Sequence, residues 1–131
     1  MEDTVRMERV PGTSAGRSSG SAYGHLVWVT ATSERKEIDL KKQIATSFDK
    51  IDRVLSDFKT DRRYLLFAYV LLSSLDDQKI FDVEWEAWVG DNPNHWPQRV
   101  CVGAILSPGT LVEIAVVAAR PLRSNTLHSI A

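Results

Sequence analysis

The spacing of the hydrophobic residues changes between residues 38 and 72, and this change constrains the fold more than any other feature. From about Ile38 to Phe58 they recur every three or four positions, which predicts an amphipathic helix. The apolar stripe consists of Ile44, Phe48, Ile51, Leu55 and Phe58. Tyr64 to Leu72 is then a nearly continuous apolar run, typical of a strand covered on both faces. A helix followed closely by a buried strand predicts a domain that combines both element types around one core.

Two strands are predicted before this helix. Val5 to Val10 alternates weakly and is a candidate first strand, and His25 to Thr32 is rich in Val and Trp, as strands are. Gly12 to Ala22 between them is rich in Gly and Ser and contains Arg17. This segment lacks the Gly-Lys-Ser/Thr ending of a phosphate-binding loop, so we interpret it as a flexible surface loop.

A second helix is predicted after the buried strand. Ser73 to Asp77 offers N-cap candidates and two acids for a first turn, and the helix should end near Val89. It carries two apolar stripes, Ile80, Val83 and Ala87 on one side and Phe81, Trp85 and Trp88 on another. Two stripes indicate burial against the sheet and against a second surface. That second surface is either a partner subunit or a loop of the same chain.

The last predicted strands run from Arg99 to Leu106 and from Leu111 to Ala119, joined by a compact turn at residues 107–110. The predicted order is therefore β-β-α-β-α-β-β, an α+β layout with two helices on one sheet. The 131 residues suffice for one domain, which we expect to span residues 1–121. Residues 122–131 are expected to be a polar, disordered tail.

Charge and cysteine content limit the function classes. Lys plus Arg total 16 against 17 for Asp plus Glu, which gives a net charge of −1 and no electrostatic footprint for nucleic acid or an anionic membrane. The single cysteine, Cys101, excludes an intrachain disulfide and favours a reducing compartment, so we expect a cytoplasmic protein. His25, His95 and His128 have no metal-ligand spacing, and we expect neither a metal nor a cofactor.

Glu113 is the most informative residue because it interrupts the otherwise apolar strand from Leu111 to Ala119. Burial of a carboxylate is costly unless the group is paired, hydrogen-bonded or protonated. One interpretation is a sheet-edge or interface glutamate in a salt bridge with a neighbour. The other is a general base with a raised pKa. The sequence favours neither.

Arg99 opens the preceding strand, as a surface cation or as a fork that binds a substrate carboxylate through two hydrogen bonds. Cys101 lies two residues on, where buried packing is commoner than a nucleophile. If Pro108 and Gly109 centre a tight hairpin, Arg99 lies about 16 Å from the level of Glu113, at ~3.3 Å per residue. That distance predicts a site shared between subunits, with the arginine and the glutamate from different chains.

Two groups of motifs resemble the Rid (YjgF-type) family. Its usual form is Pro-x-Arg-x-Cys-Val, a short stretch and then a Val-Glu-Ile strand, matched here by Pro97 to Val102 and Leu111 to Ile114 with Pro108-Gly109 between. Gly24 to Val29 resembles the family's Gly-x-Leu-Val-x-Val strand. The resemblance covers about residues 17 to 120.

The resemblance implies a chorismate-mutase-like fold, a mixed sheet with two helices on one face, and a homotrimer with sites between subunits. It also implies a deaminase that hydrolyses reactive enamines or imines to a 2-oxo acid and ammonia. In that reaction Arg99 holds the substrate carboxylate and Glu113 positions the attacking water. Positioning and general-base assistance of ~10²- to 10⁴-fold would suffice.

Four further residues are assigned by the same resemblance. Thr30 and Ala31 stand where the family usually has Ser-Gly, whose backbone helps to hold the substrate. Trp85 falls at the aromatic wall of the site, and Cys101 belongs to the arginine motif and is grouped with the substrate-binding residues. Tryptophans near the site, at positions 85, 88 and 96, predict a bulkier or aromatic substrate.

Three other functions are compatible with these motifs. The first is a non-catalytic trimer that binds a small acid, which needs Arg99 but not Glu113. The second is a pathway-specific enzyme acting on another labile amine intermediate. The third is ribonuclease or translation-inhibitor activity, also attributed to family members, which the net charge of −1 and the lack of a basic stripe disfavour.

Overall fold

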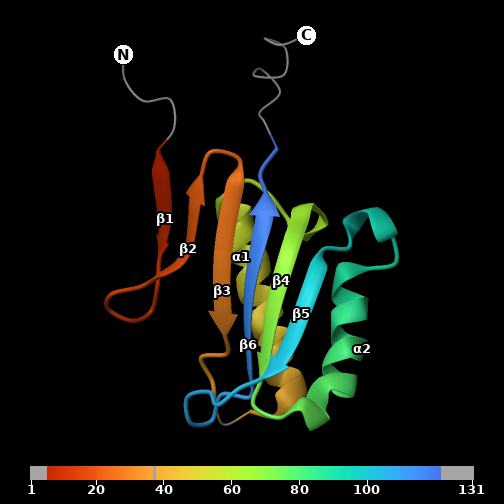
Figure 1. The fold of residues 1–131 in the computed structure, drawn as a ribbon. Helices are drawn as coiled ribbons and strands as arrows, with labels where there is room; N and C mark the ends of the chain where they lie inside the picture. Colours follow the sequence, from red (N-terminus) through yellow and green to blue (C-terminus); the bar gives the residue numbers. More distant parts are fainter. Residues whose placement is uncertain (1–5, 37, 122–131) are drawn as a thin grey trace, which may run out of the picture.

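The computed structural model describes residues 6–36 and 38–121, which contain one six-stranded sheet. Its strands are β1 (Met7–Pro11), β2 (Ser18–Tyr23), β3 (Leu26–Thr32), β4 (Leu65–Leu72), β5 (Gln98–Gly103) and β6 (Val112–Ala119). The spatial order is β1-β2-β3-β6-β4-β5 (Figure 1). All neighbours are antiparallel except β4 and β5, which are parallel. The sheet is therefore mixed, as predicted.

Two helices, α1 (Leu40–Asp57) and α2 (Gln78–Val89), pack on one face of this sheet (Figure 1). Three short 3₁₀ turns connect the elements, η1 (Arg62–Tyr64), η2 (Leu75–Asp77) and η3 (Pro93–His95). The predicted α+β class with two helices on one face is confirmed. None of the described helices has the length and apolar character needed to cross a membrane. The predicted tail at residues 122–131 lies outside the described residues.

Strand β2 was not predicted, so the order is β-β-β-α-β-α-β-β rather than β-β-α-β-α-β-β. It occupies the second half of the segment interpreted as a loop, Gly12 to Ala22. Its small residues hide its strand character because α1 passes very close to it. A Cβ at Gly20 would lie 2.6 Å from Cγ1 of Val54 and 3.1 Å from Cε2 of Phe58. Pairing with β1 and β3, rather than strand propensity, holds β2 in the sheet.

Helix α1 begins and packs as its sequence predicts. The Asp39 carboxylate caps it by accepting a hydrogen bond of 3.0 Å from the Lys42 backbone N–H. The predicted stripe is buried against the sheet, and Phe48 also reaches α2. There its ring stacks on Trp88 with centroids 4.3 Å apart, in a cluster completed by Phe81 and Trp85. The stripe of α2 formed by Phe81, Trp85 and Trp88 is therefore buried in the core between the two helices and the sheet.

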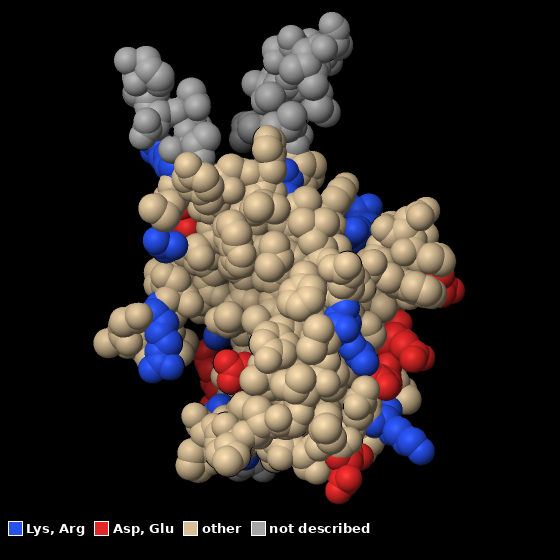
Figure 2. Space-filling view, viewed as in Figure 1, with Lys and Arg blue, Asp and Glu red and all other residues tan. Residues whose placement is uncertain are grey.

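The opposite face of the sheet has no covering layer in the described chain. The prediction that β4 is covered on both faces is wrong for one chain, since Leu66 and Tyr69 are 48% and 41% exposed. Figure 2 shows the middle of this face as a broad surface without charged side chains. The second stripe of α2 is also open, with Val83 63% exposed, so no described loop covers it. Exposed apolar area of this extent is typical of an interface.

Asp52 on α1 provides a test of the packing between the two helices. Its carboxylate accepts a 3.2 Å hydrogen bond from Nε1 of Trp88 and lies 3.6 Å from Nε of Arg62. Burial nevertheless raises the pKa of Asp52 above its usual value of 3.8, against the opposing effects of the Trp88 hydrogen bond and Arg62. The charged form of Asp52 therefore lowers the stability of the folded protein. This loss appears as the pH rises through the raised pKa of Asp52.

We therefore expect Asp52→Asn, which keeps an acceptor for Trp88, to raise the urea midpoint at pH 7 relative to wild type. The difference should shrink as the pH is lowered toward 3.8, because the wild-type carboxyl is then neutral as well. Urea unfolding at several pH values measures both. A destabilised variant at pH 7 would show that the Arg62 pair outweighs burial.

Candidate functional site

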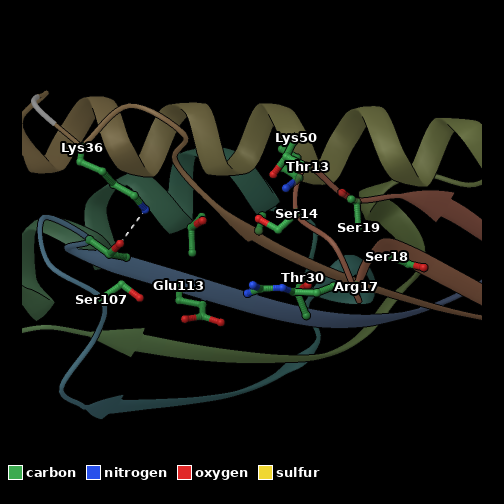
Figure 3. Close-up of a pocket in the computed structure, with 14 residues that line it drawn as sticks. Thr13, Ser14, Arg17, Ser18, Ser19, Thr30, Lys36, Lys50, Ser107 and Glu113 are labelled. Atoms are coloured by element: carbon green, nitrogen blue, oxygen red, sulfur yellow. Dashed lines mark hydrogen bonds between the residues drawn. The ribbon is translucent and has the colours of Figure 1, made fainter.

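One open cavity of about 300 Å³ lies where the β1–β2 loop, the end of β3, the start of β6 and the β3–α1 loop meet (Figure 3). Three of the residues singled out in the sequence line it: Thr30, Ala31 and Glu113. Hydroxyls of Ser14, Ser107 and others surround them. The cavity is polar, in contrast to the uncharged sheet face beside it (Figure 2).

Glu113 is the second residue of β6, and its side chain lines the cavity. It is register partner to Thr32 on β3 and Leu71 on β4, so its side chain lies on the face away from the helices. The side chain is half-buried. No described residue donates a hydrogen bond to its carboxylate or forms an ion pair with it. The salt bridge that was one interpretation of Glu113 is thus not formed within the described chain, and its carboxylate is free to hold a water or a substrate.

The end of β3 presents an unpaired backbone edge to the same cavity. β2 pairs with β3 only as far as Gly20 opposite Val29, whereas β3 continues to Thr32. Thr30 and Ala31 therefore have one edge without a strand neighbour, at the point where they line the cavity. An unpaired strand edge offers N–H and C=O groups to a ligand.

Gln43 on α1 holds the two loops that frame the cavity. Its side chain is fully buried, and Nε2 donates to the backbone oxygens of Gly109 at 2.9 Å and Ile38 at 3.3 Å. Oε1 accepts from the backbone N–H of Leu111 at 3.0 Å. One amide thereby ties the β3–α1 loop to the turn that precedes β6, and so fixes the level at which Glu113 enters the sheet.

Arg99 lies elsewhere, on the helix face of the sheet. It is register partner to the fully buried Ala68, and its guanidinium stands 5.4 Å from the ring centre of Trp85. Nη2 donates to Oδ1 of Asp82 at 2.7 Å, and the arginine side chain is only 20% exposed. Its remaining N–H groups at the edge of β5 are available to a ligand from outside the chain.

The predicted hairpin between the last two strands is wrong. β4 lies between β6 and β5, and β5 runs parallel to β4 instead of pairing with β6. Arg99 and Glu113 are therefore separated by the sheet itself, on its two opposite faces. One chain therefore does not bring Arg99 and Glu113 together. The cause is their position on opposite faces of the sheet and not, as expected, their distance along a hairpin.

Trp85 and Cys101 accompany Arg99 on the helix face. Trp85 is 8% exposed and packs in the aromatic cluster of the core. Trp88 does so too, so neither indole enlarges the cavity of its own chain, and Trp96 donates to the Gly90 backbone oxygen outside it. Burial raises the pKa of the Cys101 thiol, an effect that Arg99 partly offsets. A protonated, half-buried thiol packs rather than attacks.

Comparison with known proteins decides the family. The sequence model of the family described as Endoribonuclease L-PSP matches residues 21–120, most of the chain. The chain belongs to this family. The YjgF-type membership that the motifs predicted is confirmed.

Individual relatives agree with this assignment. The chain is 30% identical over 98 residues to the RutC family protein YoaB of Escherichia coli, covering 74% of this chain and 84% of that one. A putative translation initiation inhibitor from Salmonella typhimurium has a TM-score of 0.77 and 30% identity, over 86% of this chain and 96% of the other. A YjgF family member from Neisseria meningitidis has a TM-score of 0.78 and 26% identity, over 90% and 98%.

The cavity of this YjgF-type chain also contains three cations that the sequence did not bring to attention. Lys36 and Lys50 reach in from the β3–α1 loop and from α1, and Arg17 from the β1–β2 loop (Figure 3). Arg17 lies in the segment that was interpreted as a flexible surface loop, and Lys50 lies on α1 outside its apolar stripe. Only the three-dimensional arrangement places these cations in one cavity with Glu113, because the three cations and Glu113 come from four different segments of the chain.

Proposed function

We propose that this YjgF-type protein hydrolyses reactive imines and enamines of 2-amino acids to 2-oxo acids and ammonia. The observation that carries the proposal is the unpaired carboxylate of Glu113, half-buried in a cavity beside the open backbone edge of Thr30 and Ala31. A carboxylate in that position is suited to orient a water and to accept its proton. Backbone groups of β3 would hold the substrate next to it.

The reaction begins with water hydrogen-bonded to Glu113. Its oxygen attacks the imine carbon, the C=N π electrons move to nitrogen, and Glu113 takes one proton from the water. The resulting carbinolamine receives a proton on nitrogen from Glu113. Glu113 then takes the proton of its hydroxyl and delivers it to nitrogen as the C–N bond breaks, which releases ammonia and leaves the 2-oxo acid. Water is the only co-reactant, and no redox step or cofactor is involved.

We further propose that the working unit is a homotrimer with the site shared between neighbours. Arg99 and Glu113 lie on opposite faces of one sheet, so a substrate that contacts both must bridge two chains. The uncovered sheet face, including the exposed Trp28 and Tyr69, and the open stripe of α2 supply apolar area for such contacts. In the assembly Arg99 of one subunit binds the substrate carboxylate opposite Glu113 of the next.

The direct test is loss of a freshly generated imine in the presence of the wild-type protein. An amino-acid oxidase produces 2-iminopropanoate or an aromatic 2-imino acid in place, and semicarbazide trapping or absorbance follows its disappearance. We expect the protein to shorten the lifetime of at least one imine and to release ammonia in equal amount. Lifetimes equal to those in buffer for every imine tested would contradict the proposal and favour a trimer that only binds small acids.

A further inference from the structure

The cavity is rich in positive charge, although the chain as a whole is slightly acidic. The protein as a whole has a net charge of −1, yet Arg17, Lys36 and Lys50 line this one cavity, and Glu113 is the single acid among the described residues that line it. Figure 3 shows Lys36 at one end, and Arg17 and Lys50 at the end formed by the β1–β2 loop. Such an arrangement attracts an anion to a defined place.

The three cations are not equivalent. Nζ of Lys36 already donates to Oγ1 of Thr110 at 2.5 Å. The side chains of Arg17 and Lys50 have no hydrogen bond or ion pair with any described residue. Arg17 extends across Thr30 toward Glu113 in Figure 3, so its guanidinium faces the reaction site instead of solvent alone. The free donors therefore come from the β1–β2 loop and from α1.

We propose that Arg17 and Lys50 bind a second acidic group, so that the preferred substrate is a 2-imino or enamine acid with an acidic side chain. This inference rests on the proposed function. In the proposed reaction the neighbour's Arg99 binds the carboxylate next to the imine carbon. Arg17 and Lys50 then have no acidic group of the substrate to bind. A guanidinium and an ammonium that flank one anion form charge-assisted hydrogen bonds with a carboxylate or with a phosphonate.

A monocarboxylic imino acid leaves this charge uncompensated, whereas the second acidic group of a dicarboxylic one offsets part of it. The mechanism at Glu113 does not change, because the second acidic group binds at the end of the cavity and does not touch the imine carbon. The specificity then depends on residues of the β1–β2 loop and α1. The aromatic substrate predicted from the tryptophans is disfavoured, since Trp85 and Trp88 pack in the core.

The test compares two imines of equal size that differ in charge. Amino-acid oxidases generate them in place from glutamate and from glutamine, and kcat/KM for imine loss is measured for each. We expect wild type to prefer the glutamate-derived imine ~10- to 100-fold, the range for a charged hydrogen-bond partner. Arg17→Gln and Lys50→Met should abolish that preference, because they lower kcat/KM for the glutamate-derived imine far more than for the glutamine-derived one. Arg17→Lys should restore part of it.

Arg53→Gln and Lys41→Met are matched controls, because both cations lie on α1 outside this cavity. They should retain the full preference, and unchanged thermal unfolding should show that all variants fold. Equal kcat/KM for the two imines in wild type, or a preference that survives Arg17→Gln and Lys50→Met, would overturn the inference while imine hydrolysis itself stands.

A binding measurement keeps the inference testable if no imine is hydrolysed. Calorimetry compares 2-oxoglutarate, its phosphonate analogue and 2-oxopentanoate with wild type and with Arg17→Gln. Tighter binding of either doubly acidic compound, lost in the variant, supports the anion site and identifies which acidic group it takes. Equal affinity of all three compounds overturns it. Failure of the catalytic proposal and failure of the anion site are thus separate results.

Discussion

Glu113→Gln is expected to lower kcat for imine hydrolysis by about 10²- to 10⁴-fold, the range for loss of a positioned general base. The amide is nearly the same size, so the cavity keeps its shape, but it does not accept a proton from the attacking water. Affinity for the 2-oxo acid product should stay near that of wild type, because binding relies on the cations and the backbone edge. Steady-state kinetics and calorimetry measure the two effects. A variant with wild-type kcat would remove Glu113 from the chemistry.

Arg99→Ala supplies the companion variant, and the two together test whether the site is shared. Alone it should raise KM for the imine, since the substrate carboxylate loses its fork. Mixing the two impaired variants in one trimer places an intact arginine opposite an intact glutamate in about one quarter of the sites, as random assembly requires. Recovery of activity near that fraction after co-refolding is therefore expected. Mixtures no more active than either variant would show that both residues act from one chain.

Gln43→Leu is expected to lower the free energy of unfolding by about 3 to 4 kcal/mol, the cost of several backbone groups left without partners. The leucine fits the apolar surroundings, but the oxygens of Ile38 and Gly109 and the N–H of Leu111 lose the amide that joins them. Urea denaturation at neutral pH gives the value. Gln98→Leu at an exposed position of β5 is the matched control and should change it by less than ~0.5 kcal/mol.

The same variant should disturb the cavity even where the protein still folds. Both loops that Gln43 joins contribute lining residues, Lys36 on one side and Thr110 on the other. We expect their separation to loosen the position of Glu113 and to reduce kcat together with stability. A stability loss below ~1 kcal/mol would mean that water replaces the amide in this network.

The sequence predicted most of the fold because periodicity records burial. The stripe of α1 and the apolar run of β4 appear where expected, and the first of these is buried as predicted. β2 was missed because the close approach of α1 requires small residues there, and small residues do not have the strand propensity that a sequence pattern reveals. The β5–β6 hairpin was wrong because a turn such as Ser107 to Thr110 determines only the local chain direction. It does not reveal that β4 intervenes between the two strands.

Prediction of the candidate site was limited in the same way. Glu113 stood out because a charged residue in an apolar strand requires an explanation, and Thr30 and Ala31 came from the family motif. Arg17 and Lys50 carry no such signal, since a basic residue in a polar segment is ordinary. Their significance depends on the β1–β2 loop and α1 meeting at one cavity, which a pattern of single residues does not express.

The position of β6 has a consequence for biosynthesis. It is the last described strand along the chain, yet it lies at the centre of the sheet and joins β1-β2-β3 to β4-β5. A nascent chain that lacks it has two separate half-sheets with exposed apolar edges, so the domain completes its fold only after β6 leaves the ribosome. Early termination within β6 should therefore give products that chaperones hold or proteases remove, rather than a shortened domain with residual structure.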